Sequence, residues 1–163
     1  MILEAGTWAP NHHLTEPWRF VVIANEERLK LGVSMARALE KTLKKDDPRS
    51  EEILNAERQK PLRAPVIIAV VLSPKVDDDK VVEIEEIIAA GAALQNVLLA
   101  AHSLGIGTMV RTGKHSFEDP VRSYLGMSPR EKLVGLVYAG YPSEPPRPSK
   151  RNPLETKVEW RGM

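Results

Sequence analysis

The residues best suited to take part in chemistry lie in one polar loop near the N-terminus. Segment 9–20 contains two prolines, the adjacent pair His12 and His13, and Trp18, and it leads into a run rich in valine and isoleucine. Loops of this kind on a rigid scaffold often carry function. A zinc site needs three or four ligands in suitable geometry, and adjacent histidines point in different directions, so we expect no metal centre.

Other familiar catalytic arrangements are missing from the sequence. It contains neither a Gly-x-Ser-x-Gly turn, as in many hydrolases, nor a Walker-type phosphate loop. Gly105 and Gly107 follow a predicted helix, whereas a dinucleotide-binding fingerprint follows a strand. Cysteine is absent, which excludes disulfides, thiolate nucleophiles and cysteine-ligated metals. The side chains therefore offer no obvious catalytic constellation.

Length and charge place the chain among ordinary globular proteins. It has 163 residues, enough for one domain with a hydrophobic core, and a formal net charge of +1. This balance gives no argument for a nucleic-acid or charged membrane partner. We see no run of about 18 apolar residues and no signal-peptide pattern, so we expect a soluble, cytoplasmic protein.

Hydrophobic periodicity predicts the elements that hold the loop in place. Strands are expected at 18–24, 66–72, 106–110 and 131–138, the second of them covered on both faces. Helices are expected at 1–7, after an Asn25 cap, at 49–60 as a solvated face or lid, at 82–103 and at 117–124. The apolar side of the helix after Asn25 is expected to carry Leu29, Val33, Ala36 and Leu43. The acidic triplet 77–79 favours a turn and a helix start over a calcium loop.

Segment 82–103 is predicted to be a central packing helix. Its apolar residues repeat at helical spacing, and residues 89–93 are all alanine or glycine, which allows another helix to come close. After Pro142 the chain is rich in proline and should form an extended arm over a surface, such as that of a second subunit. The order of elements predicts one α+β or α/β domain over 1–163, with a four-stranded sheet and an arm over 142–163.

Four regions, in order, resemble motifs of the FMN-dependent nitroreductase family. They are the loop 8–20 (WAPNHHLTEPWRF), the helix segment 91–101 (GAALQNVLLAA), the turn 104–113 (LGIGTMVRTG) and the ending 137–144 with 150–155 (VYAGYPSE and KRNPLE). Each motif alone is common. Together, over nearly the whole chain, they resemble the small single-domain NAD(P)H nitroreductases.

The resemblance implies an α+β fold of three α-β-α layers, with a mostly antiparallel sheet, a long central helix and FMN at the interface of a homodimer. By position it assigns cofactor binding to Trp8, Asn11, His12, Val110, Arg111, Thr112, Gly113, Lys150 and Arg151. Backbone N–H groups near Thr112 and Gly113 would meet flavin N5, and Arg151 would contact the phosphate. The alternatives are a core position for Trp8, a loop cap for His12 and a solvated surface position for Arg111.

The resemblance also implies a reaction. NADH or NADPH would pass hydride to FMN, and a nitroaromatic, quinone or similar acceptor would then take it up in the same pocket by ping-pong kinetics. The protein would hold the ring and supply no catalytic side chain. A non-catalytic flavin-binding dimer and a flavin-dependent small-molecule dehydrogenase are the alternatives. Family members carry an upstream Arg-Arg-Ser segment that grips the phosphate, so this N-terminally shorter sequence is expected to bind FMN weakly.

Overall fold

A four-stranded antiparallel sheet forms the centre of the molecule. The computed structural model describes residues 1–44, 47–74, 81–145 and 148–162, so the acidic triplet 77–79 lies outside the described residues. The strands in the described part are β1 (Trp18–Ala24), β2 (Val66–Leu72), β3 (Gly107–Arg111) and β4 (Lys132–Gly140), in the order β1-β2-β4-β3. All neighbouring strands are antiparallel. β1 and β3 are therefore the two edges of the sheet, and the predicted sheet is confirmed.

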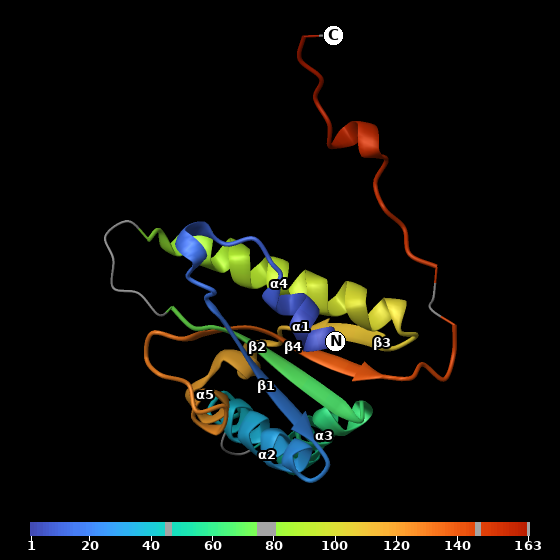
Figure 1. Cartoon of the computed structure of the whole chain (residues 1–163). Coiled ribbons are helices and arrows are strands. Elements are labelled where there is room, and N and C mark those ends of the chain that lie inside the picture. The colour runs from blue at the N-terminus through green and yellow to red at the C-terminus, as the bar shows by residue number, and fades with distance from the viewer. Residues whose placement is uncertain (45–46, 75–80, 146–147, 163) are drawn as a thin grey trace.

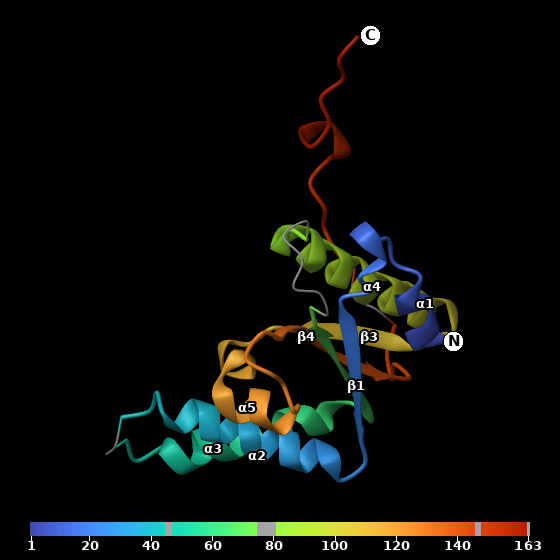
Figure 2. The ribbon, with the colours of Figure 1, turned by 60° about the vertical axis from the view of Figure 1, so that its left-hand side comes forward.

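Helices cover both faces of this sheet and complete three layers (Figures 1 and 2). One layer contains α1 (Ile2–Thr7) and α4 (Glu83–Ser103); the other contains α2 (Glu27–Glu40), α3 (Ser50–Gln59) and α5 (Asp119–Tyr124). Short 3-10 turns occur at η1 (His12–Leu14), η2 (Lys60–Arg63), η3 (Lys114–Phe117) and η4 (Leu154–Thr156). β2 is buried along almost its whole length, as its unbroken apolar run predicts.

The buried face of α2 matches the one that periodicity predicts only in part, at Ala36. Leu29 and Val33 are exposed, whereas Leu31 and Met35 lie in the core. The predicted Asn25 cap is also wrong, because Asn25 adopts a left-handed turn with φ of 50° and Glu26 stands at the helix start. Gly32 explains the rotation: a Cβ there would clash with the carbonyl oxygen of Arg58, so the backbones of α2 and α3 meet along that line.

α4 is confirmed as a long helix, but only one of its apolar sides faces the core. The buried residues are mainly small: Ala89, Ala90, Ala93, Val97 and Ala101. A second line of residues faces outward, and we call it the outer stripe: Ile84, Ile88, Gly91, Gln95 and Leu99. Ile84 and Ile88 are 57% and 63% exposed, and a Cβ on Gly91 would meet nothing within 4 Å. The small middle of α4 thus lies open on one side.

The hydropathy of α4 corrects one sequence-based expectation. By length and composition alone the helix could cross a membrane. It packs on α1 and on the sheet, however, and its first turn carries the acidic residues Glu83, Glu85 and Glu86. These features are those of a core helix in a globular fold.

The C-terminal segment leaves the three-layer body. Residues 148–162 run away from the sheet and contain only the short turn η4 (Figures 1 and 2). Every residue of this segment is exposed, including Leu154 and Trp160. Within one chain, residues 148–162 of the arm therefore cover no surface of the body.

An ion pair joins the start of β1 to the turn before β4. The guanidinium of Arg19 donates to Glu131 from Nε at 2.7 Å and from a terminal nitrogen at 3.1 Å, and the backbone N–H of Ser128 donates to the same carboxylate at 2.7 Å. The bonds from Arg19, aided by Ser128 and opposed by burial, lower the pKa of Glu131 from 4.5 to about 2. Folding therefore favours the charged form of the Glu131 carboxylate.

We expect Glu131→Gln to destabilise the protein at neutral pH but much less in acid. Because the folded pKa lies below the ordinary value, the pair stabilises fully above pH 4.5 and loses its contribution as the pH falls through about 2. The loss at pH 7 is at most about 3 kcal/mol, reduced by solvent around Arg19. Urea unfolding at pH 7 and pH 3 measures it, with the exposed Glu52→Gln as control. An equal loss at both pH values would contradict the assignment.

Candidate functional site

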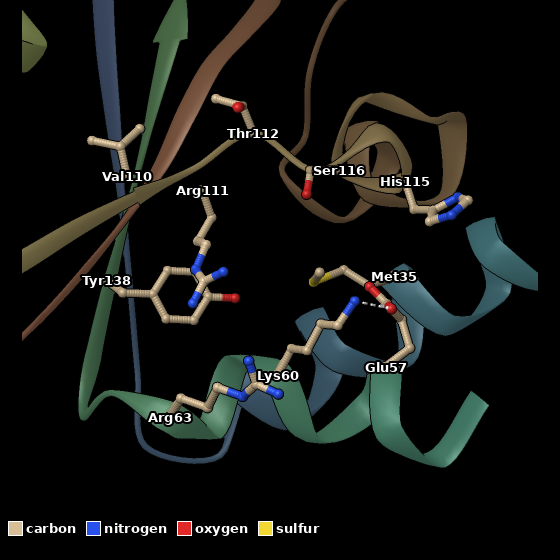
Figure 3. Close-up of a pocket in the computed structure, with 11 residues that line it drawn as sticks. Met35, Glu57, Lys60, Arg63, Val110, Arg111, Thr112, His115, Ser116 and Tyr138 are labelled. Atoms are coloured by element: carbon tan, nitrogen blue, oxygen red, sulfur yellow. Dashed lines mark hydrogen bonds and ion pairs between the residues drawn. The ribbon is translucent and has the colours of Figure 1, made fainter. Parts of the chain in front are cut away.

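A cavity of about 430 Å³ opens at the β3 edge of the sheet, on the side of α2 and α3 (Figure 3). Its lining comes from four stretches of the chain: Met35, Glu57, Lys60, Arg63, Val110, Arg111, Thr112, Gly113, His115, Ser116 and Tyr138. The volume lies in the range of small-molecule sites. This cavity is the candidate site.

Positive charge dominates the cavity. Glu57 is buried and forms an ion pair with Lys60, three residues on in the chain. Arg63 and Arg111 form no ion pair within the described residues and lie beside the ring of Tyr138 (Figure 3). Three cations thus face a single carboxylate, and that arrangement favours an anionic ligand.

Neutral polar groups complete the lining. Burial raises the pKa of Tyr138, opposed by the nearby Arg111 charge, so its hydroxyl remains a hydrogen-bond donor at neutral pH. Ser116 is buried, and the Nδ1 atom of His115 is buried with no hydrogen-bond partner among the described residues. Buried polar atoms are normally paired, so these groups are available to a ligand.

The end of β3 brings four of the sequence-predicted residues into the cavity. These are Val110, Arg111, Thr112 and Gly113. Side chains alternate along the strand. Val110 and Thr112 approach Gly135 on the α4 face, and a Cβ there would lie 3.0 and 3.6 Å from their methyl carbons. Arg111 points the other way, beside Tyr138 (Figure 3). Thr112 therefore lines the cavity with its backbone and not with its side chain.

The N-terminal loop lies elsewhere. It packs on the first half of α4, where His12 Nδ1 lies 2.8 Å from a carboxylate oxygen of Glu85. Within the loop, the side-chain oxygen of Asn11 accepts a hydrogen bond from the backbone N–H of Glu16 at 3.0 Å. Trp8 is 81% exposed, so the alternative that it is a core residue is wrong. The loop leads into β1 at one edge of the sheet, and the cavity lies at the other edge, beside β3. Three strand spacings of about 4.8 Å separate those edges.

The C-terminal arm holds the remaining sequence-predicted site residues. Lys150 and Arg151 are exposed on the segment that leaves the body, and among the described residues Arg151 donates only to the carbonyl oxygen of Lys150, at 3.0 Å. Within one chain the structure therefore joins 110–113 but does not bring them to Trp8, Asn11 and His12, or to Lys150 and Arg151.

Sequence reasoning missed the basic side of the cavity. Segment 49–60 reads as a solvated face, and for Leu54 and Glu57 that prediction is wrong, since both are buried. Two signals were present: Leu54 and Glu57 are three residues apart, on one face of a helix, and Lys60 and Arg63 closely precede the buried strand β2. Only the fold shows that they face Arg111.

Comparisons with known proteins agree on one family. The model of the nitroreductase family matches residues 1–141. A Bacillus subtilis protein with the provisional name NAD(P)H nitroreductase YfhC is 30% identical over 156 residues, which cover 96% of this chain and 78% of that protein. A nitroreductase-like protein of Bacillus cereus has a TM-score of 0.79 at 25% identity and covers 99% of this chain and 82% of its own. A Desulfovibrio desulfuricans structure, provisionally named a nitroreductase and solved with FMN, has a TM-score of 0.66 at 29% identity, with coverage of 99% and 82%.

Proposed function

The chain belongs to the nitroreductase family, and we propose that it is an FMN-dependent oxidoreductase that uses NADH or NADPH to reduce small acceptors such as nitroaromatics and quinones. The observation that carries this proposal is the cavity beside β3. It combines Arg63 and Arg111, which form no ion pair within the described residues, with buried polar atoms and the backbone of residues 110–113.

The lining residues fit an FMN molecule. FMN carries a phosphate, and its reduced ring is anionic, which suits the cations Lys60, Arg63 and Arg111. The backbone N–H groups of Thr112 and Gly113 are proposed to donate to the ring, and Met35 and Tyr138 supply apolar and aromatic surface. When bound, the flavin supplies hydride transfer. The chain itself binds, orients and neutralises charge, and no side chain needs to move a proton.

We propose that two copies of the chain complete the site. Loop and cavity lie at opposite edges of one sheet, so Trp8, Asn11 and His12 can reach the cavity of a second copy but not their own. The outer stripe of α4 supplies an apolar face, with Gly91 at its centre, for the same copy. Lys150 and Arg151 would then arrive from the arm of that copy. We further propose that residues 1–163 act as one domain with this arm, in the cytoplasm, without nucleic-acid or membrane partners.

Titration of the purified protein with FMN tests the proposal, followed by NADH or NADPH oxidation with a quinone and with a nitroaromatic acceptor. We expect saturable quenching of flavin fluorescence and parallel ping-pong lines in the initial rates. FMN binding without turnover would favour the non-catalytic flavin-binding dimer. Turnover with neither acceptor class but with oxidation of a small molecule would favour a dehydrogenase. Absence of FMN binding at any concentration would refute all three.

A further inference from the structure

Within the turn 12–16 of the N-terminal loop, Thr15 is buried while its neighbours face solvent. Thr15 is 6% exposed, whereas Leu14 is 84% exposed and His12, His13 and Glu16 are exposed as well. The hydroxyl of Thr15 donates to Oε1 of Glu86 at 2.6 Å. Glu86 belongs to the first part of α4 and is only 3% exposed. A buried hydrogen bond to a carboxylate therefore anchors the turn 12–16, whose other residues from His12 to Glu16 are exposed.

The loop needs an anchor because its backbone is strained. His13, Leu14 and Glu16 have φ of 53°, 54° and 45°, in the left-handed region that side chains with a Cβ disfavour. Histidine tolerates this region better than most residues, but for leucine it is an outlier. Such conformations persist only where the surroundings over-determine them, and they gather at functional sites.

The bond to Glu86 is the stronger of the two that the Thr15 hydroxyl could make. Its other acceptor is the carbonyl oxygen of His12, 3.3 Å away. A hydroxyl has one proton to donate, and bonds to a carboxylate are shorter and stronger than bonds to a carbonyl. The second anchor is Asn11, whose side chain accepts from the backbone N–H of Glu16. Thr15 and Asn11 thus hold the two sides of the turn.

Only one of the two carboxylate oxygens of Glu86 forms a hydrogen bond within the described residues. Its second oxygen, Oε2, is buried and has no hydrogen-bond partner within the described residues. Burying a carboxylate with one oxygen unpaired is unfavourable for stability, and an apolar residue at this position of α4 would avoid that loss. Because the buried Glu86 carboxylate lowers the stability of the fold, its presence points to a role in placing the loop.

We propose that Glu86 is a positioning residue that, through the hydroxyl of Thr15, holds the left-handed turn 13–16 and thereby presents His12 to the flavin site of the second copy. The inference rests on the proposed function for the site that the loop serves. Glu86 itself touches neither cofactor nor substrate; its effect passes through Thr15.

Two substitutions remove the bond from opposite ends, and two conservative ones retain it. Thr15→Val keeps the shape but loses the donor, and Glu86→Leu loses the acceptor. Thr15→Ser keeps a hydroxyl, and Glu86→Gln keeps an acceptor oxygen. Thr42→Val is the matched control, because the hydroxyl of Thr42 also bonds to a backbone carbonyl three residues back, at the end of α2.

The first measurement is the rate at which chymotrypsin cleaves the flavin-free protein after Leu14. We expect Thr15→Val and Glu86→Leu to raise it about tenfold or more, as expected from losing one bond to a charged group. The double variant should be no faster than either single one, since both remove the same interaction. Thr15→Ser and Thr42→Val should behave like the unmodified protein, and Glu86→Gln, which keeps a neutral acceptor, should lie between the unmodified protein and Glu86→Leu.

The second measurement is FMN affinity by fluorescence, with thermal unfolding recorded on the same samples. We expect the two disruptive variants to bind FMN about tenfold more weakly, Thr15→Ser to restore binding and Glu86→Gln to restore it in part. If the unmodified protein binds FMN and Thr15→Val and Glu86→Leu bind it equally well, the positioning role is wrong while the proposed function stands. If the unmodified protein binds no FMN, the proposed function is wrong and the role at the flavin site falls with it, while proteolysis still shows whether Glu86 holds the loop.

Discussion

Gly91→Arg should convert the proposed dimer into a folded monomer of about 18.2 kDa that has lost its affinity for FMN. The position lies at the centre of the outer stripe of α4, where a Cβ meets nothing within the same chain. An arginine there is a better helix former than glycine, by nearly 1 kcal/mol, so the monomer itself should not lose stability. The long charged side chain would instead hold a second α4 away.

Light scattering coupled to size-exclusion chromatography measures the change, and thermal unfolding confirms that the monomer is folded. Gly91→Ala is the matched control. It makes the same gain in helix propensity with only a methyl group, so it should remain dimeric. FMN affinity should follow the dimer across the series, because Trp8, Asn11 and His12 are proposed to act on the cavity of the other copy. A Gly91→Arg protein that stays dimeric, or a monomer that binds FMN normally, would refute the shared site.

Thr112→Pro should lower kcat for NAD(P)H-dependent reduction by about a hundredfold or more, whereas Thr112→Ala should leave most of it. The side chain of Thr112 lies on the α4 face, near Gly135, and only its backbone lines the cavity (Figure 3). Proline removes the one N–H that residue 112 contributes. Loss of a single donor to developing negative charge costs about 10²–10³ in rate.

The backbone immediately before position 112 already suits a proline there. A residue before proline prefers extended backbone, and Arg111 is already the last residue of β3. Rapid-mixing measurements of flavin reduction on FMN-loaded protein separate slower chemistry from weaker FMN binding, and circular dichroism checks the sheet. Equal rates for Thr112→Pro and Thr112→Ala would show that this N–H has no part in the reaction.

Local patterns in the sequence predicted the elements closely where one residue type dominates. The runs at 18–24 and 66–72 coincide with β1 and β2, since β-branched side chains favour extended backbone whatever surrounds them. The order of elements and the motif resemblance led to the correct fold class and family. The buried faces of the helices were less predictable. Leu29 and Val33 satisfy helical spacing but point outward, because α2 meets α3 along the side of Gly32, where any larger side chain would clash with the backbone of Arg58.

By itself, then, the sequence determined the strands, the long helix and the family, because each of these depends on short, contiguous segments. The tertiary structure decided what depends on segments far apart in the chain. It placed Lys60 and Arg63 opposite Arg111 and Tyr138, it buried Glu86 against Thr15, and it put loop and cavity at opposite edges of one sheet. Strand order and helix packing set these distances, and neither leaves a periodic signal in the residues that they bring together.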